Sequence, residues 1–242
     1  MYAELIEIDS RAFGRNVLSL HDFSPDENFA EFENNYIQEY NPAYVYCKIP
    51  IEHIDNVHSL EKHQFNLVEL QIESSINLNK PYDTSRYGYQ FEEVSTMDKL
   101  QEVLEIAGTT IVHDRFTRDP LVPKHVSGER YKGYVMKSFY ADNESVYRLY
   151  DPKTQQTLGF KTHKLIGNNE VLFLLGGVHP QYKNLGLGVI NSFFEFNELI
   201  GKGIKKGYTH ISAINYHVFN LEIGKLGFRV LTTYAVMRKV YA

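Results

Sequence analysis

The segment from Val171 to Gly203 constrains the fold of this chain more than any other. Val171 to Val178 is a near-continuous apolar run, which predicts a strand covered on both faces. Gly186 and Gly188 then open a segment whose apolar residues recur at helical spacing, and Gly203 stands where such a helix would end. The segment therefore predicts a strand, a glycine-containing turn and a helix.

The predicted turn is suited to binding an anion. Two glycines let backbone N–H groups approach a ligand with no Cβ in the way. The first N–H groups of a helix have no intrahelical acceptors and carry partial positive charge. A phosphate or pyrophosphate fits such a turn, although a plain strand-to-helix connection would show the same glycines. Neither Gly-Lys-Ser/Thr nor Gly-x-Gly-x-x-Gly is present, so the spacing is neither a P-loop nor a dinucleotide fingerprint.

Polar, turn-rich residues 77–89 divide the chain into two predicted parts. We predict a small α/β domain at residues 1–88 and a larger domain at residues 89–242. In the first part the patterns indicate strands at 44–49 and 65–76 around a helix at 51–62. In the second part they indicate helices at 92–107, 126–139 and 216–226, an antiparallel meander at 145–150, 157–164 and 171–178, and strands at 210–214 and within 228–240.

Two short segments have their own turn or loop signals. Ser24, Pro25 and Asp26 favour a turn or a helix start. Residues 113–123, with two prolines and several charges, predict a loop. No internal repeat is visible along the sequence.

Composition excludes several classes of function. The net charge of −5 argues against binding nucleic acid through phosphate contacts. The single cysteine, Cys47, rules out an internal disulfide and a multi-cysteine metal site, and we predict no metal. The acidic, alternating N-terminus does not resemble a signal peptide, and no apolar run reaches the length of a membrane span. These features predict a soluble cytoplasmic protein with no membrane partner.

Two motifs resemble one enzyme family. Lys183 to Gly188 is similar to the Gln/Arg-x-x-Gly-x-Gly/Ala acyl-CoA signature of the GNAT N-acyltransferases, with lysine in place of arginine or glutamine. Ile211 to Asn215 and Lys225 to Phe228 resemble the strand with asparagine and the Gly-Phe pair that follow it in that family. The resemblance implies a GNAT fold, of the α+β type with a central mixed, mostly antiparallel sheet, preceded here by the smaller α/β domain.

The resemblance also implies a site for acyl-CoA as co-substrate. In such proteins two parallel strands splay apart and hold the pantetheine arm like an added strand. The residues implied in binding acyl-CoA are Leu175, Gly177, Val178, Lys183, Asn184, Leu185, Gly186, Leu187, Gly188, Asn215 and Asn220. Asn215 could instead end its strand and cap the next helix.

The resemblance implies an oxyanion contact and candidate proton acceptors, but no general acid at the family's usual position. Gly176 and Gly177 permit a bulge, and the Gly176 backbone is expected to polarise the thioester carbonyl. His217 and His163 are the candidate proton acceptors, with water as the alternative. The tyrosine that serves as general acid in the family falls at Ile223, so the usual acid is absent or displaced.

A narrower resemblance concerns the acceptor. Residues 113–120 and 211–238 look like the branch of the family that acylates dTDP-linked amino-dideoxysugars for surface polysaccharides. The acyl group transferred would be acetyl or a short hydroxyacyl group such as 3-hydroxybutyryl. Arg115, Arg118 and Arg130 are then expected to meet the pyrophosphate, and Phe116 and Tyr131 the thymine, with Phe116 equally suited to core packing. The alternatives are acetylation of a peptide or small amine, or a non-catalytic module that binds acyl-CoA. A homodimer formed through the tyrosine-rich N-terminal domain is plausible.

Overall fold

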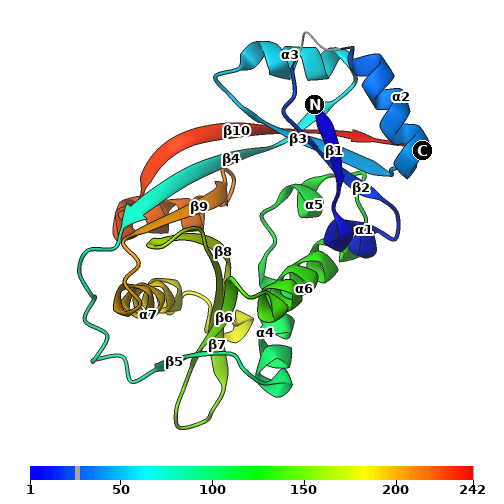
Figure 1. Cartoon of the computed structure of the whole chain (residues 1–242). Helices are drawn as coiled ribbons and strands as arrows, with labels where there is room; N and C mark the ends of the chain where they lie inside the picture. Colours follow the sequence, from blue (N-terminus) through cyan, green and yellow to red (C-terminus); the bar gives the residue numbers. More distant parts are fainter. Residues whose placement is uncertain (25–27, 242) are drawn as a thin grey trace.

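A computed structural model describes residues 1–24 and 28–241 of the chain (Figure 1). Within these residues ten strands form one sheet in the order β1-β2-β3-β10-β4-β9-β8-β7-β6-β5. The strands are β1 Tyr2–Leu5, β2 Val17–His21, β3 Tyr44–Pro50, β4 Asn66–Asn77, β5 Gln90–Glu93, β6 Glu144–Tyr150, β7 Thr157–Leu165, β8 Glu170–Val178, β9 Lys206–Ser212 and β10 Arg229–Val240. The helices are α1 Glu7–Phe13, α2 Phe29–Tyr40, α3 Ile54–Lys62, α4 Met97–Thr110, α5 Arg115–Arg118, α6 His125–Tyr140, α7 Leu187–Gly201 and α8 Tyr216–Leu221, with short turns η1 Pro180–Tyr182 and η2 Glu222–Leu226. The mixed sheet confirms the predicted fold class.

The last strand, β10, pairs with strands from the N-terminal part of the chain. β10 lies between β3 and β4 and runs antiparallel to both, so that Tyr234 stands opposite Pro50 on one side and Gln71 on the other. Ala235 and Met237 are fully buried in the core of the N-terminal half. Figure 1 shows the C-terminus beside α2, far from the helices that precede β10 in the sequence. The boundary predicted at residue 88 falls in the connection between β4 and β5, and it stays a prediction.

The connectivity contains a repeat that the sequence does not display. β2, α2, β3, α3 and β4 supply two parallel paired strands and one long strand of the same direction, and β8, α7, β9, α8 and β10 do the same. Each long strand crosses into the other half, because β10 pairs with β3 and β4 pairs with β9. The two halves therefore share a central pair of strands and complete each other's sheet.

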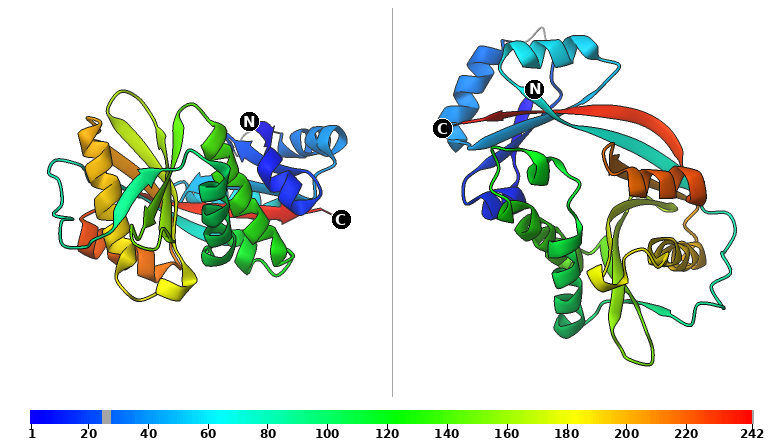
Figure 2. Two further views of the ribbon diagram at one scale, coloured as in Figure 1. Left: turned by 90° about the horizontal axis from the view of Figure 1, so that it is seen from below. Right: turned by 180° about the vertical axis from the view of Figure 1, so that it is seen from behind.

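Helices cover both faces of the C-terminal half. Ile106 and Thr110 of α4 would meet a Cβ placed at Gly177, whereas Gly176 faces Lys161 on the opposite side of the sheet. Figure 2 shows α4 and α6 on one side of β6, β7 and β8 and α7 on the other. Phe196 and Leu199 of α7 are buried against Val171 of β8, which explains the apolar runs in both segments.

The predicted elements are confirmed in outline and differ at two places, residues 90–96 and residues 113–123. The antiparallel meander β6-β7-β8 forms as expected. The helix predicted from residue 92 begins at Met97, because Gln90–Glu93 pair as an edge strand with β6. The predicted loop at 113–123 contains α5, capped by the Asp114 carboxylate. The turn predicted at 24–26 lies, apart from Ser24, outside the described residues. None of the described helices is both long and apolar enough to span a bilayer.

Candidate functional site

The two parallel strands of the C-terminal half separate along their length. β8 and β9 pair only where Glu170, Val171 and Leu172 face Lys206, Gly207 and Tyr208. β8 continues to Val178 and stays paired with β7 to that end. The edge of β8 toward β9 therefore opens after Leu172. In the N-terminal half β2 and β3 stay paired from Val17 to Leu20, so of these two parallel pairs the C-terminal one alone opens.

The backbone of β8 directs hydrogen-bonding groups into this opening. The N–H groups of Leu175 and His179 both donate to β7, to Thr162 Oγ1 at 3.0 Å and to the Leu158 carbonyl at 2.8 Å. Successive N–H groups along a strand alternate between its two edges. Those of Gly176 and Val178 consequently point to the open edge. An extended ligand with amide groups could pair there as an added strand.

The strand also bulges, two residues before the predicted place. The register with β7 shifts between Thr162 and His163, which leaves Leu174 as the extra residue. Gly176 and Gly177 lie outside the bulge, and neighbouring side chains pack closely against both of them. A Cβ at Gly177 would lie 2.7 Å from the Phe160 ring, and one at Gly176 would lie 2.9 Å from Lys161 Cδ.

The turn after β8 exposes its backbone. Asn184 and Gly186 adopt left-handed conformations with φ of 68° and 74°. The first helical hydrogen bond runs from the Val189 N–H to the Gly186 carbonyl at 3.1 Å, so the N–H groups of Leu187 and Gly188 precede it. A Cβ at Gly186 would meet nothing within 4 Å, and one at Gly188 only Leu221 Cδ2 at 3.5 Å. The turn thus has the open, amide-lined geometry that an anion requires.

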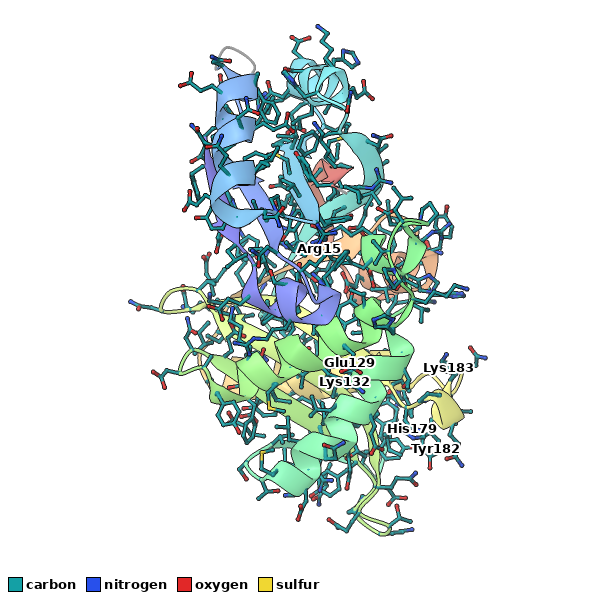
Figure 3. All side chains as sticks on the ribbon, turned by 90° about the vertical axis from the view of Figure 1, so that its right-hand side faces the viewer. Arg15, Glu129, Lys132, His179, Tyr182 and Lys183 are labelled. Atoms are coloured by element: carbon teal, nitrogen blue, oxygen red, sulfur yellow. The ribbon has the colours of Figure 1, made fainter. Side chains whose placement is uncertain are left out.

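In the turn between β8 and α7, some side chains are exposed and others are buried. Lys183, Asn184 and Leu185 are exposed, and Leu187 is buried. Figure 3 shows Lys183 at the outer end of this turn, near His179 and Tyr182. His179 also lines a shallow hollow of about 320 Å³ between α4 and the turn that joins β6 to β7. The predicted cationic residue therefore stands beside the exposed amides, free of close packing.

The predicted asparagines lie on the far side of the opening. Asn215 caps α8, with its Oδ1 accepting the Val218 N–H at 3.3 Å. This contact matches the capping alternative, and a role in binding the ligand stays a prediction. Asn220 and the candidate base His217 lie on α8 with exposed side chains.

His163 belongs to a buried polar cluster beneath α7. Its Nδ1 lies 3.2 Å from Glu195 Oε1, and the Tyr147 ring stacks on its imidazole. Lys161 completes the cluster, with Nζ 3.4 Å from Glu195 Oε2 and donating to Ser192 Oγ at 3.0 Å. His163 is 2% exposed and Glu195 is fully buried. The structure thus places the two candidate histidines apart, one sealed under α7 and one on the surface.

Glu222, which precedes Ile223, is not among the site residues predicted from the sequence. The structure places it at the start of a π-helical turn, with its Oε2 buried and without a hydrogen-bond partner among the described residues. Burial, together with the negative charge of Glu195, raises the pKa of Glu222 to about 7 against the opposing effect of Lys161. An acidic residue between the apolar residues Leu221 and Ile223 was the signal that could have identified it.

Four of the five predicted acceptor residues gather in one buried cluster. Arg130 Nε donates to Asp9 Oδ1 at 2.7 Å, and Arg115 lies 3.9 Å from Asp9 and 3.8 Å from Glu69. Phe116 is fully buried against Phe13 and Tyr44, and Tyr131 is also buried. Arg118 is exposed and lies outside the cluster. Arg115 and Arg130 neutralise carboxylates of the protein. Contact of the three arginines with a nucleotide stays a prediction.

Comparison with solved structures supports the fold. No known family profile matches the sequence, and no curated protein is similar to it. A GCN5-related N-acetyltransferase from Sphaerobacter thermophilus superimposes with a TM-score of 0.68 and 12% identity, over 99% of this chain and 76% of that one. The fold is that of the GCN5-related N-acetyltransferases.

Two other structures agree. A tandem GNAT protein from the clavulanic acid biosynthesis pathway gives a TM-score of 0.63 at 10% identity, over 93% of this chain and 75% of that one. A GCN5-related N-acetyltransferase from Kribbella flavida gives 0.62 at 12% identity, over 94% and 82%. The likeness to a tandem protein fits the repeat in the connectivity of this chain.

Proposed function

We propose that this protein transfers an acyl group from acyl-CoA to a primary amine. The observation that carries the proposal is the opening between β8 and β9, which leads to the exposed amide-lined turn at the start of α7. Pantetheine amides pair with the free edge of β8, and the diphosphate is held by the N–H groups near Leu187 and Gly188. The fold of the known N-acetyltransferases supports the same reaction.

The chemistry follows from the arrangement of the strand. The N–H of Gly176 points into the opening and can donate to the thioester carbonyl oxygen, where negative charge develops as the amine attacks. Holding both reactants in one orientation supplies a further part of the rate. His217 or water accepts the proton of the amine, since His163 is sealed beneath α7.

For the acceptor we propose the amine of a dTDP-linked amino-dideoxysugar, in a cytoplasmic step toward surface polysaccharide. The resemblance of residues 113–120 supports it. Among the predicted arginines, Arg118 is the exposed one and is the group that would meet a pyrophosphate from outside. A peptide or small amine is the alternative acceptor, because Arg115 and Arg130 already neutralise internal carboxylates.

Free thiol release tests the proposal. The protein is incubated with acetyl-CoA or 3-hydroxybutyryl-CoA and a panel of dTDP-aminosugars, hexosamines and short peptides. Release that depends on a dTDP-aminosugar supports the full proposal, and release with peptides or simple amines supports the alternative acceptor. Calorimetry with CoA separates the remaining cases. Binding without any turnover indicates a non-catalytic acyl-CoA module, and absence of binding contradicts the assignment.

Lys183→Ala is expected to weaken CoA binding moderately. Lys183 is exposed, so its attraction to a phosphate is screened and contributes about 1 kcal/mol, or roughly five-fold in Kd. The difference should shrink as salt rises. Calorimetry at two salt concentrations checks this, with Lys62→Ala on α3 as a control that leaves Kd unchanged. An equal Kd for Lys183→Ala and the wild type at low salt would remove Lys183 from the site.

A further inference from the structure

The π-helical turn after α8 begins with a buried acidic residue, Glu222. A π turn holds more residues than an α-helical turn, and such turns are frequent at functional sites. Here Ile223 packs into the apolar core under α7. The preceding residue, Glu222, has a buried Oε2 with no hydrogen-bond partner in the part of the chain that the structure describes. The turn is fixed by the Phe228 N–H, which donates to the Glu222 carbonyl at 3.0 Å. Its geometry therefore gives the two neighbouring side chains different environments.

The charged groups around Glu222 come from β7 and α7. Lys161 and Glu195 are the groups whose charges act on its carboxyl, and Glu195 in turn contacts His163. The Lys161 side chain lies against Gly176, as close as 2.9 Å to a Cβ built there. Gly176 stands four residues beyond Leu172, where the pairing of β8 with β9 ends. Leu221, the residue before Glu222, lies 3.5 Å from a Cβ built at Gly188, at the start of α7. Glu222 is thus within electrostatic reach of Lys161 and follows a residue that contacts the predicted CoA turn.

We propose that Glu222 donates the proton to the sulfur that leaves when the acyl group is transferred. The inference rests on the proposed function. The amine nitrogen forms a bond with the thioester carbonyl carbon, the carbon–sulfur bond breaks, and its electron pair stays on sulfur. The Glu222 carboxyl gives its proton to that sulfur and recovers one from solvent, while the amine loses one proton to its base or to water. The products are the amide and CoA with a free thiol.

Three features suit Glu222 to this role. Its pKa of about 7 keeps a large share of the carboxyl protonated at neutral pH. Its Oε2 has no hydrogen-bond partner within residues 1–24 and 28–241 that would compete for the proton. Once the proton has left, the Lys161 ammonium stabilises the carboxylate. Ile223, which occupies the position of the family's usual acid, has no proton to give.

Glu222→Gln should lower kcat by roughly 30-fold and leave KM for acetyl-CoA within about two-fold. The loss is below that typical of a general acid, because a CoA thiolate leaves with modest help. The wild-type kcat should fall as pH rises through about 7, where Glu222 deprotonates, and this fall should be absent in the variant. Thiol release is measured with the acceptor that gives the fastest wild-type rate. Glu61→Gln on exposed α3 is the matched control with unchanged kcat and pH profile.

Stability should move in the opposite direction from activity. The folded-state pKa of Glu222 lies above its ordinary value of 4.5, so its contribution to stability is full below about pH 4.5 and is lost as pH rises through about 7. Glu222→Gln should therefore match or exceed the wild-type Tm at pH 8. A lower Tm together with a lower kcat would assign Glu222 a structural role and overturn the proposal.

Two further measurements test the role of Glu222, and the first does not depend on knowing the acceptor. In the protein labelled with ¹³C at glutamate carboxyls, the resonance missing from Glu222→Gln should titrate near pH 7 and shift with CoA but much less with desulfo-CoA. With an arylthiol ester as donor, whose thiolate needs little protonation, the 30-fold difference in thiol release should shrink below about three-fold. Equal shifts with both CoA forms, or wild-type kcat in Glu222→Gln, would overturn this inference alone. Absence of CoA binding to the wild type would overturn the proposed function and this inference with it.

Discussion

Gly188→Asp is expected to raise the Kd for CoA by roughly 250-fold without weakening the fold. The side chain has room, because a Cβ at Gly188 would meet only Leu221 Cδ2 at 3.5 Å, an ordinary contact. A carboxylate about 5 Å from a phosphate charge costs about 3.3 kcal/mol at an effective dielectric constant of about 20. At the same time an acidic residue in the first turn of α7 stabilises the helix by about 0.3–1 kcal/mol. Calorimetry with CoA and thermal unfolding measure the two effects.

Gly201→Asp is the control for this variant. It places the same charge at the other end of α7, where a Cβ would meet nothing within 4 Å. Its Kd for CoA should equal that of the wild type, and its Tm should fall slightly, because an acidic group opposes the helix dipole there. Gly188→Ala should change Kd by less than about three-fold. A wild-type Kd in Gly188→Asp would show that the amides at the start of α7 do not hold the diphosphate.

Arg130→Ala is expected to lower the free energy of unfolding by about 3–5 kcal/mol. Arg130 of α6 and Asp9 of α1 lie within hydrogen-bond distance at 2.7 Å, and Asp9 is fully buried. Removing the guanidinium leaves the buried Asp9 carboxylate with Arg115 as its remaining cationic partner, at 3.9 Å. Chemical denaturation monitored by tyrosine fluorescence measures the loss.

Two variants show whether the lost stability comes from the buried charge. Arg118→Ala on the exposed side of α5 should change stability by less than about 0.5 kcal/mol. The double variant Asp9→Asn/Arg130→Met should recover part of the loss, since no unpaired buried charge remains. If Arg130→Ala keeps wild-type stability and instead raises KM for a dTDP-aminosugar, the arginine belongs to the acceptor site as the sequence predicted.

The shared pair of central strands explains why one half of the repeat carries the opening. β10 and β4 close both halves, so each half is completed by a strand from the other. β2 and β3 remain paired along nearly the whole of β2, and their core is continuous with Ala235 and Met237 of β10. The N-terminal half therefore supports the strand β4 that borders β9, while β8 and β9 separate beyond Leu172.

The sequence by itself determined the elements that short-range patterns specify. The apolar run at Val171 to Val178, the glycines of the following turn and the period of α7 depend on backbone preferences within a few residues, and all three were confirmed. The meander followed for the same reason, because its connections are short.

Only the tertiary structure decided which distant groups meet. The contact of Arg130 with Asp9 spans 121 residues, and that of Tyr36 with Tyr241 spans 205. The insertion of β10 between β3 and β4 and the burial of Arg115 and Arg130 arise from such contacts. So does the burial of Glu222 Oε2 without a hydrogen-bond partner among the described residues. Periodicity indicates which face of an element is apolar, but the partner of that face is selected by the packing of the whole chain.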